Sequence, residues 1–234
     1  MVLPLYLAVT SAEISSVSKQ SEPMAYMACQ FSPYTQGLTN IPDSLPNGSM
    51  LILTDRMSCQ GHSANLVANQ LSDAAERLCC DSLLLDFQRP PDAESESMVK
   101  TIVETLSCPV AVTESFAEKL SCPVFLSPSP LHVPLSEYLT SWENREIWLE
   151  AALDEEIIAV KKTGTEFIQQ FPPDRLEGGF FDEELCCHYR TVIADNQITF
   201  QLFDTHQSLK MKLDLAQSLG VTRAIGLWQE LRAL

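Results

Sequence analysis

The chain has 234 residues, of which 45% are hydrophobic and 20% are charged. This length and composition exclude a disordered chain and supply enough apolar residues for one large core. The formal net charge is −16. Because such a surface repels phosphate backbones, we do not expect a nucleic-acid partner.

The apolar start of the sequence, Met1 to Val9, lacks a basic flank and is too short for a signal-peptide core. No later segment approaches the roughly 18 apolar residues of a membrane helix. We therefore expect a soluble, cytoplasmic protein without a membrane partner. The eight cysteines include two adjacent pairs. In a chain of this size, that pattern favours reduced thiols over a disulfide framework.

Short apolar runs alternate with amphipathic stretches, as is typical of β/α units and a parallel sheet. The predicted strands are Pro4–Val9, Met24–Cys29, Met50–Thr54, Ser82–Phe87, Val110–Val112, Val124–Leu126, Ile147–Ala151 and Ala224–Trp228. Eight such strands predict an α/β fold, a compact (β/α)8 TIM barrel with short connections.

Three helices are well indicated between these strands. Ser63 can cap the first, the second carries an apolar stripe that begins at Met98, and the third ends at Gly220, a residue suited to the left-handed position after a helix. Their apolar faces are expected to pack on the outside of the barrel, through Val67, Leu71, Ala74, Ala75 and Leu78 in the first, Met98, Ile102, Val103 and Leu106 in the second, and Leu209, Leu213, Ala216 and Leu219 in the third.

The stretch from Glu155 to Phe200 departs from this alternation. Ile157–Val160, Glu166–Gln170, Tyr189–Ile193 and Ile198–Leu202 read as strands joined by turn residues. We therefore predict a single domain, residues 1–234, in which residues 155–200 form a small antiparallel β-rich insertion before the last helix.

The octapeptide Asp81-Ser-Leu-Leu-Leu-Asp86-Phe-Gln88 resembles the active-site strand of glycoside hydrolase family 18, which reads Asp-x-x-Asp-x-Asp-x-Glu. Asp81 and Asp86 match the first and third acidic positions, whereas Leu84 and Gln88 replace the other two. A second block runs from Phe203-Asp204 through Ser208 and Lys212 to Trp228. It is similar to the C-terminal part of sequences in the same family. In those proteins the last strand ends in a Trp that forms the floor of a sugar subsite.

The resemblance implies a chitinase-like barrel whose catalytic motif is degenerate. In the family, the third acidic residue orients the substrate's N-acetyl group, and the final Glu acts as acid and then base. Residues two apart on a strand share a face, so Leu84, Asp86 and Gln88 should point together to the barrel mouth. Because the amide of Gln88 cannot donate a proton, turnover is expected to fall by about 10²–10⁴. The sixth strand also lacks the family's Met-x-Tyr-Asp sequence and has Leu126-Ser-Pro-Ser-Pro130 instead.

Other residues are weaker candidates for a functional site. Glu150 and Glu230 could act as a relocated acid, or be solvated carboxylates of the rim. Cys186-Cys187-His188 lacks the spacing of a zinc site. A nucleophilic pair such as Cys59 with His62 requires an oriented thiolate and base that lie close together in space. Trp142 and Trp148 could stack on a sugar or belong to the core. We expect no metal and no cofactor.

The sequence thus predicts a non-hydrolytic, chitinase-like pseudoenzyme that binds an N-acetylated oligosaccharide or a protein partner, with Asp86, Gln88 and Trp228 as the ligand-binding residues. A weak glycosidase acting on chitin- or peptidoglycan-type polymers is one alternative. An intracellular structural or interaction module without a ligand is another.

Overall fold

The computed structural model describes the chain except residues 1–2, 18–22, 162–163, 168–178, 195–196 and 233–234. Its parallel strands are β1 (Leu5–Val9), β2 (Met24–Phe31), β4 (Met50–Thr54), β5 (Ser82–Asp86), β6 (Val110–Thr113), β7 (Val124–Leu126), β8 (Ile147–Glu150) and β14 (Val221–Leu227). They follow the order β1-β14-β8-β7-β6-β5-β4-β2, and β2 pairs back with β1. The predicted closed barrel of eight parallel strands is confirmed, with β5 as its fourth strand.

The alternation of side chains along each strand divides the core in two. Leu84 of β5 belongs to a cluster inside the barrel, together with residues such as Ile52, Phe125 and Trp148. Leu83 and Leu85 of the same strand belong to the larger cluster between the strands and the outer helices. Because β5 is buried on both faces, it reads as a continuous apolar run in the sequence.

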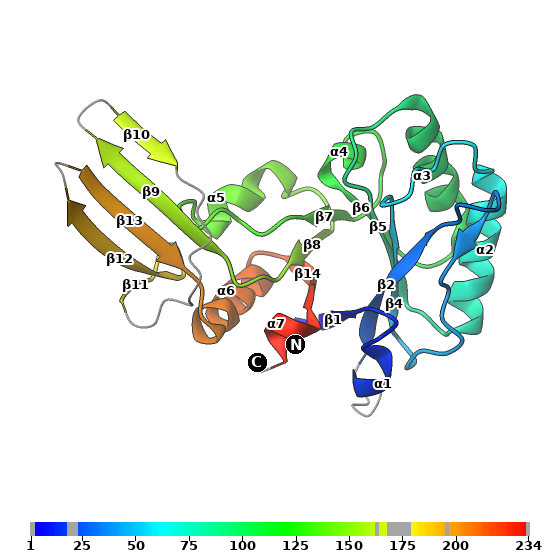
Figure 1. Cartoon of the computed structure of the whole chain (residues 1–234), viewed down its shortest axis with the longest axis horizontal. Coiled ribbons are helices and arrows are strands. Elements are labelled where there is room, and N and C mark those ends of the chain that lie inside the picture. The colour runs from blue at the N-terminus through cyan, green and yellow to red at the C-terminus, as the bar shows by residue number, and fades with distance from the viewer. Residues whose placement is uncertain (1–2, 18–22, 162–163, 168–178, 195–196, 233–234) are drawn as a thin grey trace.

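Helices α2 (Ala64–Arg77) and α3 (Ala93–Thr105) pack side by side on the outside of the barrel, and α6 (His206–Ser218) precedes the last strand (Figure 1). The side chain of Ser63 accepts a hydrogen bond from the Leu66 amide, as its position before α2 predicted. Gly220 follows α6 with a φ of 93°, also as expected. Leu219, in contrast, is exposed and does not join the inner face of α6, because that helix ends one residue earlier.

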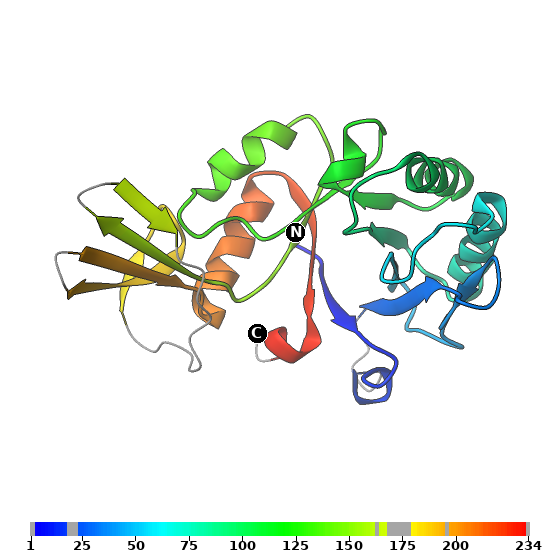
Figure 2. The same cartoon turned by 45° about the horizontal axis from the view of Figure 1, so that its top comes forward.

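The remaining connections of the barrel are short. They contain α1 (Ile14–Val17), the two-residue strand β3 (Leu38–Thr39), α4 (Glu114–Ala117), α5 (Leu135–Leu139), a 3₁₀ turn (Thr140–Trp142) and α7 (Trp228–Leu231). A four-residue helix cannot cover a strand pair as α2 and α3 do. The exterior of the barrel is therefore covered unevenly, most heavily beside β4 and β5 (Figure 2).

A second sheet lies between β8 and α6 in the chain. It consists of β9 (Glu155–Lys161), β10 (Gly164–Phe167), β11 (Phe180–Asp182), β12 (Cys187–Ala194) and β13 (Gln197–Phe203), paired antiparallel in the order β10-β9-β13-β12-β11. Figure 1 shows this sheet at the opposite end of the molecule from α2 and α3. Strand β11 was not predicted, and the end of the predicted strand Glu166–Gln170 lies outside the described residues.

Two sets of contacts attach this sheet to the barrel. The carboxylate of Glu156 accepts hydrogen bonds from the Leu131 amide and from the His132 ring, both in the segment after β7. At the same end of the sheet, directly after β13, the buried Asp204 carboxylate accepts a hydrogen bond from the Lys212 ammonium over 2.8 Å. Among the described residues, no helix is long and apolar enough to cross a membrane.

Candidate functional site at the barrel mouth

The two acidic residues of the Asp81–Gln88 motif lie at opposite ends of β5. Asp81 precedes the first residue of the strand, Ser82, and Asp86 is its last residue. Because all eight barrel strands are parallel, these two ends belong to opposite openings of the barrel. Asp86 therefore lies at the carboxyl-terminal opening, where barrel enzymes keep their active sites, and Asp81 does not.

Asp81 is part of a hydrogen-bonded group that closes the amino-terminal opening. Its carboxylate accepts from Tyr6 Oη at 2.7 Å and from the Arg223 guanidinium at 3.0 Å. Arg223 also donates to the hydroxyl of Ser82 and lies over the ring of Trp148, 4.8 Å from its centroid. Burial, followed by the hydrogen bond to Asp81, raises the pKa of Tyr6 to about 12. This group has a structural role in the barrel.

At the other opening, the strand ends surround a cavity of about 100 Å³. It is lined by Ala8, Met27, Ile52, Leu84, Asp86, Gln88, Phe125, Glu150, Ile225, Gly226 and Leu227. As predicted, Leu84, Asp86 and Gln88 face the same space. We refer to this space as the mouth cavity. It is smaller than the roughly 300–1,000 Å³ of most small-molecule pockets, so it suits a chemical group rather than a whole sugar ring.

The polar side of the mouth cavity is built on β5 and the turn that follows it. The amide nitrogen of the Gln88 side chain donates to the Asp86 carboxylate. The buried carboxylate of Asp55, directly after β4, accepts from the backbone amides of Gln88 and Arg89 at 3.0 and 2.9 Å. Asp55 thus fixes the turn from which Gln88 projects. Burial raises the pKa of Asp86 above its ordinary value, although the hydrogen bond from Gln88 opposes this effect.

Glu150, the last residue of β8, faces Asp86 from across the barrel. Its carboxyl group lines the cavity among mainly apolar side chains, and it has no hydrogen-bond or ion-pair partner among the residues that the structure describes. Burial, together with the negative charges of Asp86, Asp154 and Glu230, raises the pKa of Glu150 to about 7. Near neutral pH, this side chain is therefore a carboxylic acid for part of the time and can donate a proton.

Trp228 is placed differently from Asp86 and Gln88. It begins α7, directly after Leu227, and its half-buried ring packs against the cluster formed by Val9, Val17 and Met24. The residues that line the mouth cavity include Leu227 but not Trp228. Glu230, the other acid considered from the sequence, lies on α7 and likewise does not line the cavity.

The structure gives little support to the remaining sequence candidates. Both ring nitrogens of His62 lie within hydrogen-bonding distance of backbone carbonyls, and burial raises the pKa of the Cys59 thiol, which disfavours a nucleophilic thiolate. Trp148 is fully buried, and Trp142 packs on the core, so both are structural. Within the described part of the chain, no group of three or more His, Cys, Asp or Glu residues could hold a metal ion, Cys186, Cys187 and His188 included.

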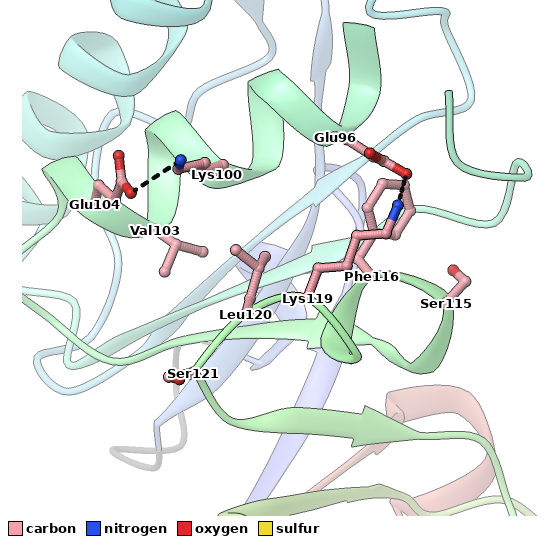
Figure 3. Close-up of a pocket in the computed structure, with 9 residues that line it drawn as sticks. All are labelled: Glu96, Lys100, Val103, Glu104, Ser115, Phe116, Lys119, Leu120 and Ser121. Atoms are coloured by element: carbon pink, nitrogen blue, oxygen red, sulfur yellow. Dashed lines mark hydrogen bonds and ion pairs between the residues drawn. The ribbon is translucent and has the colours of Figure 1, made fainter. Parts of the chain in front are cut away.

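A larger hollow lies on the outside of the barrel, between α3 and the segment of α4 (Figure 3). It has a volume of about 510 Å³, with Val103, Phe116 and Leu120 at its base. Two ion pairs lie at its rim: Lys119 binds Glu96 across the hollow, and Lys100 binds Glu104 along α3. Both lysines that line the hollow are thus paired with carboxylates, and we interpret the hollow as the space left by the short α4.

Comparisons with known proteins relate the chain to others by structure alone. No protein-family model matches it, and no curated protein matches it by sequence. A class V chitinase from Nicotiana tobaccum superposes with a TM-score of 0.58 over 97% of this chain and 93% of the chitinase, at 8% identity. A Glu-to-Gln mutant of the tobacco chitinase, solved in complex with NAG4, superposes with the same TM-score at 9% identity.

Two bacterial enzymes are also similar in structure. A glycoside hydrolase family 18 N-acetylglucosaminidase from Paenibacillus barengoltzii has a TM-score of 0.56 over 96% of this chain and 94% of its own, at 10% identity. The spore cortex-lytic enzyme SleL of Bacillus cereus has a TM-score of 0.53 over 96% of this chain and 70% of its own, also at 10% identity. The chain therefore has the family 18-like barrel fold that the two sequence blocks predicted.

Proposed function

We propose that the protein binds N-acetylated sugars at the mouth cavity and does not hydrolyse them. Asp86 is the proposed acceptor for the N–H of an acetamido group, and Gln88 keeps it in place. The observation that carries the proposal is the position of Asp86, partly buried at the carboxyl-terminal opening of a barrel whose fold is shared with chitinases. The size of the mouth cavity also suits an acetamido group better than a ring.

The side-chain amide of Gln88 favours sugar binding without hydrolysis. Gln88 lies two residues after the end of β5, at the position where the resemblance places the proton donor, and a carboxamide has no proton to give at neutral pH. Losing a well-positioned general acid lowers a rate by about 10²–10⁴. The tobacco chitinase with one Glu replaced by Gln was solved with NAG4 bound. That complex supports the idea that such a barrel can hold a sugar after a change of this type.

We further propose that Trp228 contributes at the outer edge of the site. It directly follows Leu227, which lines the cavity, and its ring is only half buried. A sugar ring whose acetamido group enters the cavity would extend toward this rim. Since much of the Trp228 ring already packs on Val9, Val17 and Met24, its effect on affinity should be smaller than that of Asp86.

Titration calorimetry with N-acetylglucosamine tetramer tests the proposal. The wild-type protein should bind it weakly, and Asp86→Ala should abolish measurable binding, because sugar hydroxyls are already satisfied by water and the loss of one partner removes much of the net energy. Asp81→Ala is the matched control: it removes a carboxylate from the same motif but at the opposite opening, so it should leave affinity unchanged. Equal affinity of the wild type and Asp86→Ala would point to another site.

A weak glycosidase is a second candidate, favoured by the free carboxyl of Glu150 in the same cavity. Protonated Glu150 would give its proton to the glycosidic oxygen while the substrate's own acetamido oxygen attacks the anomeric carbon, and water would then release the sugar. Slow hydrolysis that survives Gln88→Ala but disappears in Glu150→Gln would favour this candidate. The proposed binding function instead predicts no hydrolysis by the wild type.

A further inference from the structure

The mouth cavity contains two carboxyl groups of different character. Asp86 accepts a hydrogen bond from Gln88, whereas Glu150 has no hydrogen-bond or ion-pair partner within the described residues. The two project from different strands, β5 and β8, which are separated by β6 and β7, and both line the same small space. A ligand group that fits between them would meet both carboxyls at once.

An acetamido group has one donor, its N–H, and one acceptor, its carbonyl oxygen. Asp86 can accept from the N–H, but an ionised Glu150 could only accept as well. Two carboxylates facing one amide would leave its carbonyl oxygen without a donor in a largely apolar cavity, which is costly. A protonated Glu150 supplies the missing donor.

We propose that Glu150 is the specificity-determining residue of the mouth cavity, and that its protonated carboxyl donates a hydrogen bond to the carbonyl oxygen of an acetamido group held by Asp86. This inference rests on the proposed function and deepens it. It adds a donor for the carbonyl oxygen of the acetamido group, and it makes binding depend on pH.

The surroundings of Glu150 favour the protonated form. The acidic groups that act on it are Asp86 on β5, Asp154 after β8 and Glu230 on α7, and the phenol of Tyr138 on α5 also interacts with it. Among the described residues, the basic groups act on its neighbours: Arg56 on Asp86, and Lys212 on Asp154. Because only the protonated carboxyl can donate to the acetamido carbonyl oxygen, a bound acetamido group should raise the pKa of Glu150 further.

The test measures the dissociation constant of N-acetylglucosamine tetramer at pH 6 and at pH 8.5 by protein-observed NMR. With a pKa near 7, the protonated fraction of Glu150 falls steeply over this range. Because only that fraction is competent to bind, the wild-type affinity should weaken by about tenfold or more. Glu150→Gln keeps the shape and a permanent N–H donor, so its affinity should change by less than about twofold.

Glu230→Gln is the control, because Glu230 lies near Glu150 but does not line the cavity. It should retain most of the pH dependence. Cellotetraose, a neutral tetramer with hydroxyls in place of the acetamido groups, should not show tighter binding at pH 6 than at pH 8.5.

A second measurement tests the inference on the wild-type protein and does not depend on the folding of Glu150→Gln. The carboxyl ¹³C signal of Glu150 in the wild type reports its pKa, which should rise when the acetylated tetramer is bound, since a ligand that prefers the protonated form must raise it. Affinity that is measurable but unchanged between the two pH values, or an unchanged Glu150 pKa in the complex, overturns the inference and leaves the proposed function standing. Failure of the wild type to bind at either pH overturns both.

Discussion

Asp81 and Asp86 show how position on a strand decides the role of a residue. They are five residues apart in one motif, yet Asp81 is bound to Tyr6 and Arg223 at the closed end of the barrel. Asp86 lines the cavity at the open end. The resemblance assigned both to one acidic motif, and only the direction of β5 separates a structural carboxylate from one available to a ligand.

Arg223→Met should lower the free energy of unfolding by about 1–3 kcal/mol. The substitution removes the hydrogen bonds to Asp81, Tyr6 and Ser82 and leaves those groups at a partly buried opening. It also removes the cation from the face of Trp148. Urea denaturation measures the change. Lys210→Met, at an exposed position of α6, is the control and should stay within about 0.5 kcal/mol of the wild type. Equal stability of the two variants would contradict this role for Arg223.

At the scale of elements, α6 depends on two local features. Thr205 and Ser208 form a capping box at its first turn, and Lys212 reaches back from the helix to Asp204 at the end of β13. The helix is thereby fixed to the strand that leads out of the antiparallel sheet. We propose that this junction joins the insertion, predicted as residues 155–200, to the rest of a single domain.

Lys212→Met should destabilise the protein by about 3–5 kcal/mol, because it leaves the buried carboxylate of Asp204 without its cation. The double variant Lys212→Met with Asp204→Asn removes both charges and should recover part of the loss. Thermal and urea denaturation of the two single variants and the double variant give the coupling energy. Simple additivity of the two single effects would contradict the pairing.

The elements were predictable where one physical signal dominates. The eight barrel strands appear as short apolar runs because most are buried on both faces, and Ser63 and Gly220 bound their helices by local hydrogen bonding and backbone conformation. Strand β11 was missed because it has three partly exposed residues and pairs only with β12.

The candidate site was less predictable than the fold. Alternation along β5 placed Asp86 and Gln88 on one face. Which residues of other strands share the cavity with them depends on how the barrel closes, and no local pattern in the sequence reports this. Glu150 could therefore be named only as one of two candidate acids. Asp55 was missed, because its role is to bind backbone amides 33 and 34 residues away, and no local pattern reports such contacts.

At the scale of the whole molecule, the negative net charge and the raised pKa values of buried carboxyl groups both make stability depend on pH. Burial raises the pKa of Glu150 to about 7 and that of Asp154 to about 6, above their values in an unfolded chain. Between those unfolded values and about pH 7, the folded protein binds more protons than the unfolded one. Stability is therefore greatest in mild acid and decreases as pH rises through these folded pKa values.

We accordingly expect a lower melting temperature at pH 8 than at pH 5.5, and a smaller difference in Glu150→Gln. Added monovalent salt should raise the melting temperature at pH 8, because it screens the repulsion within a chain of net charge −16. Differential scanning calorimetry in matched buffers measures both effects. A melting temperature that increases steadily from pH 5.5 to pH 8 would contradict this account of the buried carboxyls.

The central claim is that the mouth cavity receives an acetamido sugar, and ¹H–¹⁵N chemical-shift mapping at pH 6 tests it most directly. Titration with N-acetylglucosamine tetramer should move the backbone signals of Asp86, Gln88, Glu150 and Gly226, around the cavity. The signals of Asp81 and Arg223, at the opposite opening, should not move. An absence of shifts at millimolar sugar, or shifts confined to another surface such as the hollow beside α3, would contradict the claim and favour a protein whose barrel serves interaction without a sugar ligand.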